Sequence, residues 1–264
     1  MELAAGKKQA VPFNKKKFTN AARHIFNSGK YTADMITDKP VKELISETNR
    51  AIDHAVKKGI ADNKPSAKTL DKLDNDVFVF SACKTHIQLK EVGAMLTSED
   101  TITPWSEFRT KVLEIHKLYN EDYLQAEYGF AVSSAEMGAK WDRWEQEGDR
   151  YNLQYRTAQD DRVRVSHAEL AGITLPVSDP FWNDYLPPNG WNCRCTTVQV
   201  NTGKYPESNS KSSQDKGERA TTEIDSKGHN RAAMFRFNPG KQKVIFPPHH
   251  PYYKVWKSIE NKID

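Results

Sequence analysis

Apolar residues recur at helical spacing through the first half of the chain. Between residues 38 and 60 they stand three or four positions apart and the pattern stops at Gly59, which predicts an amphipathic helix. Residues 69–96 repeat this spacing less regularly, so they are predicted to form two helices or one broken helix. The run Val77-Phe78-Val79-Phe80 also fits a strand, and periodicity alone leaves both alternatives open.

A longer helical pattern follows Thr103 and Pro104, a capping hydroxyl and a proline that together favour a helix start. Apolar and aromatic residues then recur every three or four positions as far as about Gly148. We expect one very long helix over residues 104–148, or two helices joined near Gly129. Its aromatic stripe is expected to pack against other helices, because such stripes usually face a core.

The helical period disappears after Gly148. Tyr151, Leu153 and Tyr155 alternate with polar residues, and a second alternation begins at Cys193, so two short strands are predicted with turns between them. The predicted fold class is therefore α+β, with a mainly helical N-terminal two-thirds that contains long helices. A small turn-rich module with β-structure and a basic C-terminal tail follow it.

These patterns divide the chain into three parts. A flexible linker is predicted over residues 201–222 from their Ser, Asn, Lys and Gly content, and a hairpin around Asn238-Pro239-Gly240. The parts are a helical N-terminal region over residues 1–100, a domain over 101–200 made of the long helices of 104–148 and a compact module of 151–200, and the linker with its basic extension over 201–264.

The net charge of +4 is unevenly distributed. Residues 201–264 contain twelve Lys and Arg against seven Asp and Glu, or +5, which leaves 27 against 28, or −1, for residues 1–200. A basic tail of this kind can contact DNA or another acidic partner. It can equally be a solvated tail that its lysines keep soluble, and charge alone does not decide between the two.

Composition narrows the class of protein. No apolar stretch near the start resembles a signal peptide, and no later run approaches a transmembrane span, so we expect a soluble protein made in a cytoplasm, without a membrane partner. Three cysteines, with Cys83 far from the other two, do not form a secreted disulfide framework. The glycine loops that cradle phosphates and the usual hydrolase signatures do not occur in the sequence.

Cys193 and Cys195 are the first candidate metal ligands. In an extended segment residues two apart point to the same face, so both thiols can hold one soft metal ion such as zinc. His167 is the natural third ligand, with His249, His250, Asp161 or Asp179 as candidates for a fourth. Two buried thiols that pack as small apolar groups, or a strained local disulfide, are the alternatives.

Charged residues crowd the segment just before His167. Asp160, Asp161, Arg162 and Arg164 are predicted to pin a loop through forked hydrogen bonds between arginine and carboxylate. The same residue types suit a nuclease in which His167 is the base and Arg162 or Arg194 clamps a phosphate.

Two rigid turns carrying large aromatic residues complete the module. Proline fixes a turn, glycine permits a positive φ, and tryptophan fills a small core, so we expect these residues to shape the module and not to bind a ligand. The turn residues are Asp179, Trp182, Pro188, Asn189, Gly190 and Trp191.

The order of these elements resembles the phage Mu F-like minor head proteins, also called head morphogenesis proteins, over roughly residues 105–200. The likeness is carried by a long helical lead-in and then by Asp160-Asp161-Arg162-Val163-Arg164, His167, Asp179-Pro180-Phe181-Trp182 and Pro187-Pro188-Asn189-Gly190-Trp191-Asn192-Cys193-Arg194-Cys195. Val165-Ser166 stands where the family commonly has Pro-Glu. The tail Phe235-Arg236-Phe237-Asn238-Pro239-Gly240-Lys241 looks like versions carried by prophages of Bacteroides-type bacteria.

The resemblance implies a non-enzymatic minor capsid protein of a tailed phage or prophage. Such proteins associate with the portal protein and other head components during procapsid assembly, in the host cytoplasm, and remain in the virion head. Packaged DNA is then a plausible partner for the basic residues of 201–264, because phosphates attract Lys and Arg. The alternative function is a nuclease or toxin-like enzyme that uses His167, Arg162 and Asp161.

Overall fold

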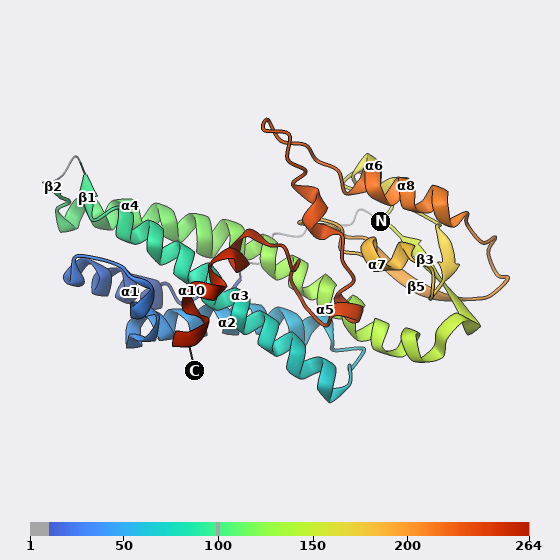
Figure 1. The fold of residues 1–264 in the computed structure, drawn as a ribbon, viewed down its shortest axis with the longest axis horizontal. Helices are drawn as coiled ribbons and strands as arrows, with labels where there is room; N and C mark the ends of the chain where they lie inside the picture. The colour runs from blue at the N-terminus through green and yellow to red at the C-terminus, as the bar shows by residue number, and fades with distance from the viewer. Residues whose placement is uncertain (1–10, 99–100, 264) are drawn as a thin grey trace, which may run out of the picture. The chain divides into compact units, whose positions relative to one another are not determined.

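The computed structural model describes residues 11–98 and 101–263, and it has the predicted α+β class (Figure 1). Long helices dominate the first 150 residues, and a three-stranded antiparallel sheet lies in the C-terminal part. The chain folds as two compact units. Among the described residues, unit 1 contains 11–53, 78–98, 101–128 and 251–263, and unit 2 contains 54–77 and 129–250. The predicted divisions at residues 100 and 200 stay predictions.

Unit 1 is a helical assembly around one apolar core. Asn14 caps α1 (Lys15–Ser28) by accepting a hydrogen bond from the backbone N–H of Lys16, and Gly29 ends the helix with φ of +64°. The core includes Phe18, Ile25, Leu44, Leu89, Val92, Phe108 and Ile115. The other elements of this unit are η1 (Ala33–Thr37), parts of α2 (Lys39–Gly59) and α3 (Ala67–Ala94), β1 (Thr97–Ser98), β2 (Thr101–Ile102), α4 (Trp105–Lys117), η2 (Leu118–Tyr123), η5 (Pro251–Val255), α10 (Trp256–Ile259) and η6 (Glu260–Lys262).

Helix α2 confirms the amphipathic helix predicted over residues 38–60. Helix α3 is a single element of 28 residues, so the alternatives of two helices or a strand at Val77-Phe80 are wrong. The prediction that the Thr103 hydroxyl caps the next helix, with Pro104 as its first residue, is wrong. Helix α4 begins at Trp105 with Pro104 at its cap, and the buried Thr103 hydroxyl has no hydrogen-bond partner.

The helical region predicted over residues 104–148 is interrupted, but not near Gly129 as predicted. Helix α4 passes into the π-helical η2 and then into α5 (Leu124–Glu147), so the irregular turn lies at Leu118–Tyr123 and Gly129 is inside a regular helix. Such π-helical turns are rare and occur mostly as single turns within α-helices. Tyr119 and Asn120 are both buried in η2.

Unit 2 contains the sheet, in the order β4-β3-β5. The predicted strand at Tyr151 is confirmed as β3 (Tyr151–Arg156), which pairs antiparallel with β4 (Thr174–Pro176) and β5 (Thr196–Asn201). Leu153 of β3 lies opposite both Leu175 and Gln199. The short helices α6 (Val165–Ala168) and α7 (Phe181–Asp184) both contact α8 (Ser210–Ala220), close to the sheet (Figure 1).

The flexible linker predicted over residues 201–222 is largely the helix α8, capped by the Asn209 side chain. This helix buries the small residues Ser213, Gly217 and Ala220. A Cβ on Gly217 would lie 2.5 Å from the ring of Tyr185, so glycine permits this close approach. The helix therefore packs without the large apolar residues that would have revealed it in the sequence.

The hairpin predicted around Asn238-Pro239-Gly240 is also wrong. Asn238 accepts hydrogen bonds from the backbone N–H groups of Gly240 and Lys241 and starts the short helix α9 (Pro239–Gln242), with η4 (Ala232–Phe235) before it. The Asn238 amide donates to the carbonyl oxygen of Trp182 at 2.8 Å, which anchors the segment in unit 2. The basic extension is thus folded, and residues 251–263 belong to unit 1. Across the part of the chain that the structure describes, none of the helices combines the length and apolar character needed to cross a membrane.

Candidate functional site

His167, Cys193 and Cys195 come together in unit 2. His167 lies in the single turn of α6. The two cysteines lie in the segment that leads into β5 and end just before the strand, whereas the sequence pattern predicted them within it. All three side chains are buried, with 2%, 7% and 6% of their surfaces exposed. The sequence prediction that these residues converge is therefore met by the geometry.

The distances within this group are short and nearly equal. The Nδ1 atom of His167 lies 3.6 Å from the Sγ of Cys193 and 3.7 Å from the Sγ of Cys195. One donor atom from each residue falls within 4.8 Å of the others. All three cysteines of the chain are free thiols in this structure. Two sulfurs and one imidazole nitrogen form the kind of donor set that soft metal ions prefer.

The two thiols have opposite acid strengths. Hydrogen bonds from the Cys195 thiol and from His167 hold the pKa of Cys193 well below its usual range, despite burial. The hydrogen bond to Cys193 and burial raise the pKa of Cys195.

Tyr155 supports the site from β3. Burial, and then the neighbouring Cys193 and Cys195, raise the pKa of its hydroxyl well above the usual value, so the group stays protonated. It donates a hydrogen bond of 2.8 Å to the Oδ1 of Asn189. Asn189 follows the cis peptide between Pro187 and Pro188, and both prolines are buried. The predicted proline turn is thus tied directly to the sheet.

Arginine and carboxylate groups fasten the loop before α6, but the arginine that forms the fork is Arg194 and not Arg162 or Arg164 of the predicted set. The Arg194 guanidinium forms a forked pair with Asp160, with Nη1 at 2.6 Å from Oδ2, and holds the pKa of that carboxyl far below its usual range. Arg162 lies on the exposed side of the same carboxylate, at 3.6 Å. Arg164 donates to the carbonyl oxygen of Trp191 at 2.7 Å and lies against Gly190.

The remaining turn residues have structural contacts. Asp179 accepts hydrogen bonds from the backbone N–H of Phe181 and the hydroxyl of Ser210, and the indole of Trp182, fully buried, donates to the carbonyl of Pro176 at 3.0 Å. Trp191 packs edge-on against Phe130, Phe235 and His250. These contacts agree with a shaping role for both tryptophans.

The candidates for a fourth metal ligand do not join the group. Asp179 accepts a hydrogen bond from Ser210, and His250 packs edge-on against Trp191. Asp161 is exposed, and His249 is exposed as well. Among residues 11–98 and 101–263, the cluster with metal-ligand geometry at this place has three members.

Two contributors were not predicted as site residues. Tyr155 was assigned only to a strand, because an alternating pattern says nothing about what a hydroxyl will meet. Asp149 accepts hydrogen bonds from the hydroxyl and backbone N–H of Ser178, at 2.6 and 2.9 Å, and so fixes the segment before α7. No local signal in the sequence links two residues that lie 29 positions apart.

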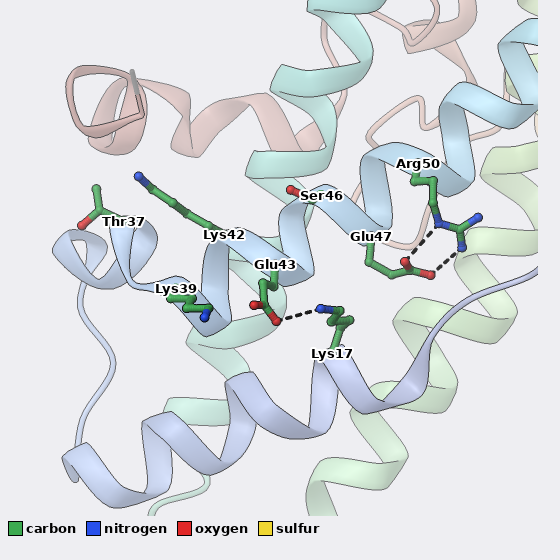
Figure 2. Close-up of a pocket in the computed structure, with 8 residues that line it drawn as sticks. All are labelled: Lys17, Thr37, Lys39, Lys42, Glu43, Ser46, Glu47 and Arg50. Atoms are coloured by element: carbon green, nitrogen blue, oxygen red, sulfur yellow. Dashed lines mark hydrogen bonds and ion pairs between the residues drawn. The ribbon is translucent and has the colours of Figure 1, made fainter.

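A separate depression of about 490 Å³ lies on α1, η1 and α2 of unit 1 (Figure 2). Figure 2 shows its charges arranged as pairs. Lys17 meets Glu43 at 2.8 Å and Arg50 meets Glu47 at 2.6 Å, while Lys42 points away from both pairs. Because its carboxylates are already paired with basic residues of the same unit, this depression carries no functional assignment.

Comparison with known proteins connects the chain to phage head proteins. Residues 49–198 match the family model described as phage Mu protein F like protein, which is more than half of the 264 residues. A stretch of 54 residues is 39% identical to the putative capsid assembly protein F of Escherichia phage Mu and covers 20% of this chain and 12% of that protein. A stretch of 41 residues is 44% identical to the Mu-like prophage FluMu F protein of Haemophilus influenzae and covers 16% and 10%. The matched stretches thus span about a tenth of each relative, and no solved structure matches the chain.

Proposed function

The chain belongs to the family of phage Mu protein F-like proteins, and we propose that it is a minor structural protein of a tailed-phage or prophage head that acts in head assembly. The observation that carries this proposal is the family match over residues 49–198. The name of the phage Mu relative, a putative capsid assembly protein, supports the same assignment. In this proposal the protein works in the host cytoplasm during assembly and stays in the finished head.

The finer part of the proposal is a position at the portal vertex, with the portal protein as the direct partner. Support comes from the family, since the minor head proteins that this chain resembles associate with the portal vertex. The test is co-expression of the full chain with the portal protein and, separately, with the major capsid protein of the same phage. Co-purification with the portal alone is expected, and binding to neither protein by a folded chain would contradict the proposal.

We propose a structural role in preference to the nuclease alternative because of where His167, Arg162 and Asp161 lie. His167 is 2% exposed and its Nδ1 faces two thiols, whereas a general base has to reach the proton it removes. Among the described residues, no hydrogen bond or ion pair joins Asp161 to His167. Incubation of the purified protein with plasmid DNA and divalent cations is expected to leave the DNA intact. Cleavage that disappears in His167→Ala would support the enzyme instead.

Contact with packaged DNA is the last part of the proposal. The charge of +5 in residues 201–264 supports it, although several of these cations are paired within the chain. The pairs are Lys211 with Asp215, Arg219 with Glu169, Arg231 with Asp225, Arg236 with Glu218, and Lys262 with Asp34. Binding to duplex DNA, followed by fluorescence anisotropy, is expected to weaken steeply as salt rises. Binding that is unaffected by salt, or no binding at low salt, would remove DNA from the list of partners.

A further inference from the structure

We propose that His167, Cys193 and Cys195 bind one zinc ion, which ties α6 to the segment before β5. The inference rests on the geometry of unit 2 and does not depend on the proposed role in head assembly. The imidazole and the two thiols come from segments 26 residues apart and meet in the interior with all three side chains buried. No helix or strand contains both segments, so the ion would join two separate parts of the chain.

The distances fit a shared tetrahedral ion. With Zn–S bonds of about 2.3 Å and a Zn–N bond of about 2.0–2.1 Å, a tetrahedral angle places each sulfur about 3.6 Å from the nitrogen. The two sulfurs lie 3.6 and 3.7 Å from Nδ1 of His167. Both distances therefore agree with ligation of one ion by the three atoms.

A hydrogen bond alone explains this arrangement less well. The Nδ1 of a neutral imidazole offers either one N–H or one lone pair, so it can serve one thiol with good geometry. Nearly equal distances to two sulfurs are the pattern that a common ion produces. Thiols that pack as small apolar groups would gain nothing from directing both sulfurs at a ring nitrogen, and a disulfide would consume both ligands.

The charge surroundings suit zinc with two thiolates. The two negative charges of the Cys193 and Cys195 thiolates would balance a divalent ion, and a neutral imidazole adds no charge, so the loaded centre would carry no net charge. Such a centre tolerates the guanidinium groups of Arg162, Arg164 and Arg194, which line the cavity beside it. An ion held by neutral ligands alone would meet three positive neighbours.

The fourth position of the tetrahedron belongs to solvent. The cavity beside the three ligands has a volume of about 10 Å³ and is lined by residues 162–164, 167 and 192–195. A space of this size holds roughly one water molecule, and its walls offer polar groups.

Sulfur and imidazole ligands with tetrahedral geometry favour zinc over magnesium or calcium, which take oxygen ligands.

The full chain is expressed with zinc in the medium and purified, and its metal content is measured by inductively coupled plasma mass spectrometry. About one zinc per chain is expected in the wild type, and a several-fold loss in Cys193→Ser, Cys195→Ser and His167→Gln. Cys83→Ser is the matched control, because Cys83 is a buried thiol of unit 1, away from the site, and its loss should leave the zinc content unchanged. Loss of zinc to the same extent in Cys83→Ser would overturn the proposal.

A second measurement keeps the inference testable if those variants fail to fold. The wild-type chain, freed of metal with a chelator and titrated with Co(II), is expected to show the visible ligand-field bands of a tetrahedral site and thiolate-to-cobalt charge-transfer bands, saturating at about one equivalent. Zinc is expected to displace the cobalt and to restore the thermal midpoint that the chelator lowers. A wild-type protein without zinc, with copper in its place, with a Cys193–Cys195 disulfide, or with a midpoint indifferent to the chelator would refute the site.

Discussion

The ion pair between Lys84 and Glu127 gives the sharpest stability prediction for unit 1. Both side chains are almost fully buried, at 1% and 3% exposure, and the ammonium group bonds directly to the carboxylate. The Tyr252 side chain, from the C-terminal segment, also hydrogen-bonds Glu127. Glu127→Gln keeps the shape and removes the charge, so it leaves Lys84 as an uncompensated cation in the core. Breaking one side of a buried pair costs about 3–5 kcal/mol of unfolding free energy.

Unfolding in urea, followed by circular dichroism, measures this loss. Lys84→Met paired with Glu127→Leu is the control, because replacing both charges by apolar groups of similar size is often neutral or stabilising. The double variant is therefore expected to be clearly more stable than Glu127→Gln. Equal stability of the two variants, or a loss below about 1 kcal/mol in Glu127→Gln, would refute the account of the pair.

The loss in Glu127→Gln should depend on pH with a definite sign. Burial lowers the pKa of Lys84, while the Glu127 charge opposes this shift, so removing that charge lowers the pKa further. The unfolded chain then binds more protons than the folded one at any pH between the lowered value and about 10.4, and stability rises with pH in that window. We expect Glu127→Gln to be less destabilised at pH 9 than at pH 6.

Three further predictions concern unit 2. Tyr155→Phe leaves the Oδ1 of Asn189 buried without its donor and is expected to cost about 1–3 kcal/mol in urea unfolding; a cost near zero would mean that solvent replaces the hydroxyl. Gly240→Ala places a methyl carbon 2.1 Å from the Cβ of Trp141, so the soluble yield and thermal midpoint should fall sharply, whereas an unchanged midpoint would contradict this packing. Asp160→Asn should lower the midpoint at pH 7 and make progressively less difference below about pH 3.9. The stabilisation from the depressed pKa of Asp160 is complete above the unfolded pKa and is lost as the pH falls towards the folded one. A difference independent of pH would argue against the ion pair.

Local patterns predicted most of the long helices. The period over residues 38–60 gave α2 directly, because one apolar stripe faces the core of unit 1. Helix α8 escaped prediction because it buries Ser213, Gly217 and Ala220 in place of large apolar residues. The π-helical turn η2 was not predicted for another reason. No proline or glycine marks it in the sequence, and it depends on packing between residues distant in sequence.

The sequence predicted the three candidate metal ligands, but it did not predict the residues that support them. Cys-x-Cys and the one histidine of the turn-rich segment were enough to select Cys193, Cys195 and His167. The proposed fourth ligands failed because a residue type does not reveal what its side chain already binds, as the contact of Asp179 with Ser210 shows. The role of Tyr155 depends on the fold that brings β3 under the proline turn.

The copy number of the chain in purified heads tests the central claim most directly. Heads of the phage or induced prophage that encodes the chain would be purified by density gradient, and the chain, the portal protein and the major capsid protein quantified by mass spectrometry with labelled peptides. We expect the chain to sediment with the heads, in an amount comparable to the portal protein and far below the major capsid protein. A chain found only in the soluble fraction, with heads that are complete without it, would contradict a role as a minor head protein.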